Sequence, residues 1–148
     1  MAVASARAWE RTPPPTGAHC WSWTPDGLDD LPRVRREFRA HISGDRLQDP
    51  ALDPDRVEES VLALDELMSN GLRHGRSPVV VEVRTTDDGL LLLVSDRAAE
   101  RPLLPTSTRD PGQGGMGLGM VAHVSLACGW VPEDDVKIVW ALMPTTAP

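Results

Sequence analysis

The run from Leu90 to Ser95 restricts the fold of this chain more than any other feature, because it is apolar without interruption until its last residue. A strand with one face in water alternates apolar and polar residues, whereas an unbroken apolar run of this length is typical of a central strand covered on both faces. The run delivers Asp96 to the end of that strand. The sequence therefore predicts a layered fold with a carboxylate at the end of its central strand.

Shorter runs predict the strands around this central one. Val79, Val81 and Val83 recur at every second position, and Asp88-Gly89 is a hairpin signal between that run and the central strand. These two strands are therefore expected to be antiparallel neighbours. Further strands are predicted at His19 to Trp23, Cys128 to Val131 and Val136 to Leu142, the last two joined across Pro132 to Asp135.

Three helices are predicted from apolar residues at helical spacing. The first begins near Asp30, the second runs from about Pro54 to about Arg73, and the third runs from Met116 to Ala127. Asp53 is placed to cap the second helix and Gly75 to end it. The first helix has a basic outer face, which is either solvated surface or a surface for an acidic protein partner. Its arginines are Arg33, Arg35, Arg36 and Arg39.

The length of 148 residues suits one domain with its own core. We expect this domain to span residues 18–144. Residues 1–17 end in a proline-rich run and are expected to form a flexible tail. Cys20 and Cys128 have no metal-ligand spacing, so both are expected to be reduced and buried.

Charge and hydropathy exclude several classes of function. The net charge of -7 opposes binding to nucleic-acid backbones, which depends on clustered Lys and Arg. No segment approaches the roughly 20 apolar residues of a membrane-spanning helix, and the N-terminal stretch lacks the apolar core of a signal peptide. We therefore expect a cytoplasmic protein that binds neither nucleic acid nor membrane.

A polar stripe on the second helix is the first candidate for chemistry. Glu66, Asn70 and His74 are four residues apart in turn, so they share one face of the helix. A carboxylate near an amide oxygen suits Mg²⁺, which takes few protein ligands and keeps several waters. Glu66 could also orient or deprotonate a nucleophile. Taken alone, an exposed polar helix face explains the same three residues.

A glycine loop leads into the third helix and is the second candidate. Free N–H groups and the helix dipole attract anions at such a helix start, and glycine lets phosphate oxygens approach the backbone. A flexible hinge is the alternative. A Rossmann fingerprint is excluded by context, because the loop follows no strand directly. A Walker A loop is excluded because no Gly-Lys-Ser or Gly-Lys-Thr follows the glycines. The glycines are Gly112, Gly114, Gly115, Gly117 and Gly119.

Three segments, read in order, resemble the three boxes of the Bergerat-type ATPase superfamily. They are Glu66-Leu-Met-Ser-Asn70-Gly-Leu-Arg-His74-Gly75, then Asp96, then Gly115-Met116-Gly117-Leu118-Gly119. The resemblance covers about residues 19–143 and is greatest to the anti-sigma-factor serine kinases of that superfamily. It implies an α/β two-layer sandwich, in which helices cover one face of a mixed, mostly antiparallel sheet. It also implies that ATP and Mg²⁺ bind between the helices and a mobile lid.

The resemblance assigns roles residue by residue. Asn70 matches the Mg²⁺ ligand, Glu66 the general base for transfer to a serine hydroxyl, and Asp96 the carboxylate that accepts the exocyclic amine of adenine. From the residues alone, Asp96 could equally be an ordinary strand-terminating aspartate. Gly115, Gly117 and Gly119 match the phosphate-proximal glycines. The remaining nucleotide contacts are expected at His74, Gly75, Gly114, Met116 and Leu118.

Partners also follow from the resemblance. Such proteins bind a sigma factor, phosphorylate an antagonist protein that would displace it, and form homodimers. One box departs from the pattern, because Asp96-Arg97-Ala98 replaces the usual Asp-x-Gly. If that position needs positive φ, Ala98 costs on the order of 1 kcal/mol and ATP binding is weakened. A noncatalytic module that sequesters its partner is therefore the alternative to a kinase.

Overall fold

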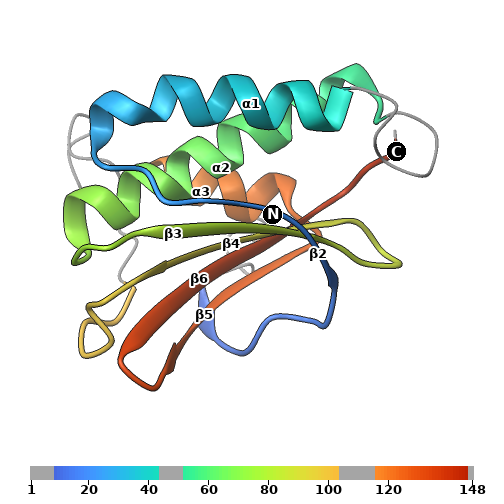
Figure 1. Ribbon diagram of the computed structural model, residues 1–148. Helices are drawn as coiled ribbons and strands as arrows, with labels where there is room; N and C mark the ends of the chain where they lie inside the picture. Colours follow the sequence, from blue (N-terminus) through green and yellow to red (C-terminus); the bar gives the residue numbers. More distant parts are fainter. Residues whose placement is uncertain (1–8, 44–51, 104–115, 147–148) are drawn as a thin grey trace.

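In the computed structural model, which describes residues 9–43, 52–103 and 116–146, three α-helices lie on one face of a six-stranded sheet (Figure 1). The sheet order is β1-β5-β6-β4-β3-β2, and every pair is antiparallel except β1 with β5. This confirms the predicted fold class. The strands are β1 (Glu10–Arg11), β2 (Ala18–Trp23), β3 (Val80–Thr85), β4 (Leu90–Asp96), β5 (Ala127–Glu133) and β6 (Val136–Met143).

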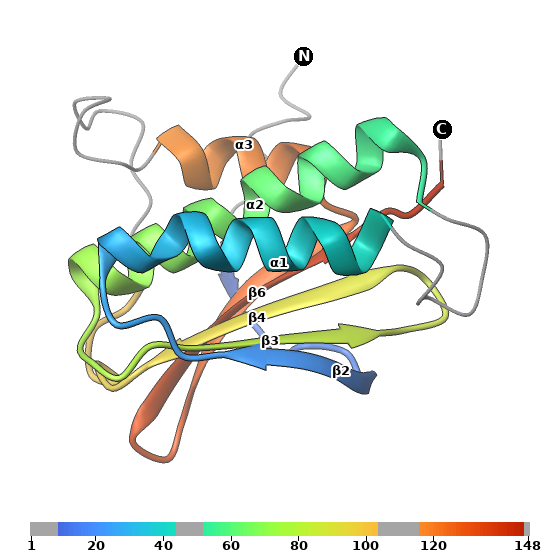
Figure 2. The same cartoon turned by 45° about the horizontal axis from the view of Figure 1, so that its top comes forward.

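The helices α1 (Leu31–Ser43), α2 (Pro54–His74) and α3 (Met116–Val124) form a single layer, with α2 in the middle (Figure 2). The side chain of Asp53 accepts a hydrogen bond from the Asp55 N–H, and Gly75 follows the last residue of α2, as predicted. Both long helices bury the apolar stripe expected from the sequence. In α1 this stripe is Leu31, Val34, Phe38 and Ile42, and in α2 it includes Val57, Val61, Leu64 and Met68.

Strand β4 is buried on both faces, as its unbroken apolar run predicts. Leu90, Leu92 and Val94 join the main core. Leu91 and Leu93 point to the other face, where they form a second apolar cluster with Trp140 and Leu142 of β6. Asp96, the last residue of β4, therefore follows a stretch of strand that is buried on both faces.

The N-terminal segment differs from the predicted flexible tail. Trp9 is 8% exposed, and β1 pairs with β5 through Glu10 opposite Gly129 and Arg11 opposite Trp130. The Trp140 indole N–H then donates to the Thr12 carbonyl at 2.8 Å, and the chain passes to β2 on the side of the sheet away from the helices (Figure 1). The prediction is therefore wrong for this segment, while residues 1–8 lie outside the described residues.

The boundary between α3 and β5 also differs from the prediction. The helix ends at Val124 rather than Ala127, because the Leu126 N–H donates to the Leu142 carbonyl at 2.8 Å and extends the pairing with β6. The predicted hairpin between the last two strands is confirmed, with Asp134 and Asp135 as its connection. The predicted long loop is described only up to residue 103, and residues 104–115 lie outside the described part.

The arginines of α1 mostly pair with carboxylates of the same molecule. Arg33 contacts Asp30 and Glu37, Arg35 contacts Asp65 at 2.8 Å, and Arg39 contacts Glu58 at 3.0 Å. These contacts favour a solvated face over a surface for an acidic partner.

Cys20 and Cys128 are both reduced. Cys128 is buried as predicted, whereas Cys20 is only half-buried. Among the described helices, none combines the length and the apolar character needed to cross a membrane.

Candidate nucleotide-binding site

The predicted polar stripe lies on the C-terminal half of α2. Glu66 and Asn70 are half-buried, whereas the His74 residue is exposed. The Asn70 side-chain amide makes no hydrogen bond with another described residue, so its oxygen is free to bind a cation. The His74 carbonyl accepts a hydrogen bond from the Arg101 guanidinium at 3.1 Å, which ties the end of α2 to the segment after β4.

Glu66 lies directly against the start of α3. A Cβ atom added to Gly117 would overlap the Glu66 carboxylate, so glycine at this position lets the two helices meet around that side chain. Burial raises the pKa of Glu66 above its ordinary value of 4.5; the negative charge of Asp65 adds to this shift and Arg73 opposes it. A carboxylate with a raised pKa is a stronger proton acceptor, which suits a general base.

Asp96 is nearly inaccessible at the end of β4, being 1% exposed. One carboxylate oxygen, Oδ1, accepts a hydrogen bond from the Ala98 N–H at 2.7 Å. The other, Oδ2, is 3.8 Å from the ammonium nitrogen of Lys137, which faces Asp96 across the β4–β6 pairing. A Cβ atom on Gly75 would overlap this carboxylate, so glycine is required where α2 ends beside β4.

Ala98 is fully buried and is not strained in the way the sequence suggested. Among the described non-glycine residues, only Asp134 has positive φ. The backbone penalty considered for Ala98 therefore does not apply. Its methyl group still fills space beside Asp96, where its own N–H binds the carboxylate.

The described part of the glycine loop is the first turns of α3. Gly117 is half-buried, Gly119 is exposed with open space around it, and Leu118 is 3% exposed in the core. The Leu118 side chain thus packs inward, and its contact with a nucleotide stays a prediction. Gly112, Gly114 and Gly115, together with the Met116 side chain, fall outside the described residues.

The family model of the histidine kinase-like ATPase domain matches residues 24–141, which include the α2 stripe, Asp96 and the glycine loop. The chain belongs to this family. A histidine kinase-like ATPase domain binds ATP, typically with Mg²⁺. A comparison with curated proteins finds no match.

The metal end of this ATPase domain fits its expected ligand. Asn70 offers a free amide oxygen one helical turn from Glu66, and no group of three or more His, Cys, Asp or Glu among the described residues could hold a metal by itself. Mg²⁺ would therefore be held mainly by phosphate oxygens and water, with Asn70 as its protein ligand. The base end fits less well, since both oxygens of Asp96 already contact Ala98 and Lys137.

The contacts of two residues with the candidate site were not predicted from the sequence. Lys137 is the only charged residue in the apolar run from Val136 to Leu142, yet its side chain is 4% exposed beside Asp96. Trp9 lies in the proline-rich N-terminal region, yet its indole N–H donates to the Leu118 carbonyl of α3 at 3.0 Å. Neither contact has a local signal, because each depends on pairing between distant segments.

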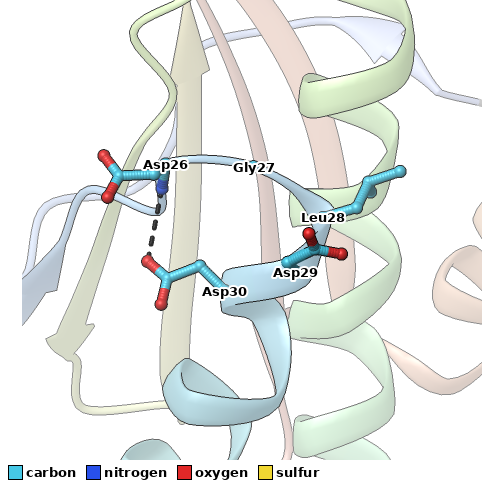
Figure 3. Close-up of a pocket in the computed structure, with 5 residues that line it drawn as sticks. All are labelled: Asp26, Gly27, Leu28, Asp29 and Asp30. Carbon is cyan, nitrogen blue, oxygen red and sulfur yellow. Dashed lines mark hydrogen bonds between the residues drawn. The ribbon is translucent and has the colours of Figure 1, made fainter.

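A shallow hollow at the start of α1 lies apart from the nucleotide site. It is lined by residues 26–30, and the Asp26 N–H donates to the Asp30 carboxylate at 3.2 Å (Figure 3). None of the predicted site residues lines it. Its three carboxylates, on Asp26, Asp29 and Asp30, would repel the phosphates of a nucleotide.

Proposed function

We propose that this domain is an ATP-dependent serine/threonine kinase of the anti-sigma-factor type. It would bind a sigma factor and phosphorylate an antagonist protein in partner switching, and so regulate transcription from the cytoplasm as a homodimer. The observation that carries the proposal is the pairing of Glu66, whose pKa is raised, with the free amide of Asn70 one turn away on α2. These are the residues that proton transfer and Mg²⁺ binding require.

Each residue has a distinct task in the proposed reaction. Mg²⁺ held by Asn70 would neutralise negative charge on the phosphates. Glu66 accepts the proton of a serine hydroxyl while that oxygen forms a bond to the γ-phosphorus. The bond from the γ-phosphorus to the bridging oxygen breaks, and ADP leaves. The start of α3 against Glu66 limits water at the carboxylate, which favours transfer to serine over hydrolysis.

Phosphotransfer to a purified antagonist tests this proposal. Wild-type protein, Mg-ATP and a cognate antagonist should yield phosphoserine or phosphothreonine detectable by mass spectrometry. Glu66→Gln should lower the rate by 10²-fold or more, the usual range for loss of a general base. Glu58→Gln is the matched control, since Glu58 lies on the same helix in an exposed pair with Arg39 and should leave the rate unchanged.

The pH profile of the same reaction gives a second readout. A base acts only when deprotonated, and burial raises the pKa of Glu66 above 4.5. The wild-type rate should therefore rise with pH through that raised pKa. Proven binding to an antagonist without any phosphorylation would rule out the kinase.

The alternative is a noncatalytic module that sequesters a sigma factor or an antagonist without ATP turnover. The contacts of Asp96 with Lys137 and Ala98 favour it, because both would compete with adenine for the Asp96 carboxylate. Tight Mg²⁺-dependent ATP binding would count against this alternative.

A further inference from the structure

The buried ion pair between Asp96 and Lys137 has no role in the proposed reaction. The two side chains are 2% and 4% exposed, and their charged atoms are 3.8 Å apart. Charges are rarely buried so completely unless they are paired, because each loses its hydration. Lys137 therefore places its amino group beside the Asp96 carboxylate, at the base end of the proposed nucleotide site.

A neighbouring pair shows that this burial is not a general property of the two strand ends. Arg97, the residue after Asp96, forms an ion pair with Asp135, the residue two positions before Lys137. Those side chains are 45% and 69% exposed, so water screens them. Of these two pairs, the Asp96–Lys137 pair is shielded from water, and its carboxylate lies against Gly75 at the end of α2.

Asp96 accepts one hydrogen bond within the described part of the protein, and its second oxygen lies beside an amino group. The Ala98 N–H occupies Oδ1, Lys137 approaches Oδ2, and Gly75 closes over the carboxylate. A carboxylate without a cation beside it accepts an exocyclic amine such as that of adenine and repels a carbonyl oxygen. With Lys137 beside it, the site presents a donor as well as an acceptor.

We propose that Lys137 is a specificity-determining residue, which weakens the preference of this domain for adenine over purines that carry a carbonyl at the same position. The inference rests on the proposed nucleotide site, with Asp96 at its base end, and not on transfer to a protein substrate. The chemical class of ligand is thus a purine nucleoside triphosphate with relaxed base identity.

Binding of ATP and of inosine triphosphate, which has a carbonyl in place of the adenine amine, tests this inference. Calorimetric titration of the full chain with each nucleotide and Mg²⁺ gives two dissociation constants. Their ratio should stay within about tenfold for wild type. In Lys137→Met, which removes the donor and nearly conserves volume, the preference for ATP should rise at least tenfold, because a site built to bind a polar group rejects an analogue that lacks it. Arg97→Met, which breaks the exposed pair, should leave the ratio unchanged.

Two results would overturn the inference. One is a wild-type protein that already rejects inosine triphosphate by a hundredfold or more, a result that needs no variant to fold. The other is a folded Lys137→Met whose ratio equals that of wild type. If wild type binds neither nucleotide, gain of ATP binding in Lys137→Met supports the inference and no gain overturns it. The titration contains no protein substrate, so absence of kinase activity would leave its outcome intact.

Discussion

Gly117 shows how one residue brings two helices together at the proposed site. A Cβ atom there would overlap the Glu66 carboxylate, whereas a Cβ atom on Gly119 would meet nothing within 4 Å. Both glycines lie within α3, where alanine is intrinsically favoured. Alanine at Gly119 therefore changes helix propensity alone, whereas alanine at Gly117 also changes the contact with Glu66.

Alanine substitutions at these glycines should have unequal effects on stability. Gly119→Ala should raise the free energy of unfolding by roughly 0.5–1 kcal/mol, because alanine loses less backbone entropy in a helix. Gly117→Ala should stabilise the protein less than Gly119→Ala, because the flexible end of the Glu66 side chain must move away from its contact with α3. Urea denaturation of the two variants measures the difference. Equal stabilisation by both would show that Glu66 does not pack against α3.

At the scale of elements, the N-terminal segment contacts both β5 and α3, the helix that follows the glycine loop. Trp9 is buried and donates to the Leu118 carbonyl, while the next residues pair with β5. Gly129 makes this possible, because a side chain there would collide with Thr12 and Trp140. The position of α3 therefore depends on a segment that precedes it by more than 100 residues.

Trp9→Phe should loosen α3. A smaller aromatic ring remains, but the hydrogen bond to the Leu118 carbonyl is lost, which costs about 0.5–1.5 kcal/mol, and part of the buried ring surface is lost as well. Hydrogen exchange should become faster at the amides of α3. Trp21→Phe is the matched control, since Trp21 stacks on His41 away from α3 and should leave that exchange unchanged. Unchanged exchange in Trp9→Phe would exclude this coupling.

At the scale of the whole molecule, local patterns were sufficient to predict most elements. Apolar spacing identified α1 and α2, and the valine and leucine runs identified β3 and β4 with their hairpin. Their side chains pack within a few residues of one another, so the pattern is visible in a short window. Strand β1 could not be found in this way, because two residues carry no period and their partner strand is distant in sequence.

The candidate site could also be predicted only in the part that depends on local sequence. The spacing of Glu66 and Asn70 follows from helix geometry, so their shared face was predictable. The pairing of Asp96 with Lys137 depends on the register between β4 and β6, which are separated by α3 and β5. Periodicity within one strand cannot supply such a register, so the contact of Lys137 with Asp96 has no signal in the sequence.

A calorimetric titration with ATP, with and without Mg²⁺, on wild type and Asn70→Ala tests the assignment of the nucleotide site most directly. Wild type should bind ATP in a Mg²⁺-dependent manner, because Asn70 is the proposed metal ligand. In Asn70→Ala the Mg²⁺ dependence should disappear and the affinity should fall by about tenfold or more, which corresponds to about 1.4 kcal/mol. Identical Mg²⁺-dependent binding by a folded Asn70→Ala would contradict the placement of the site on α2.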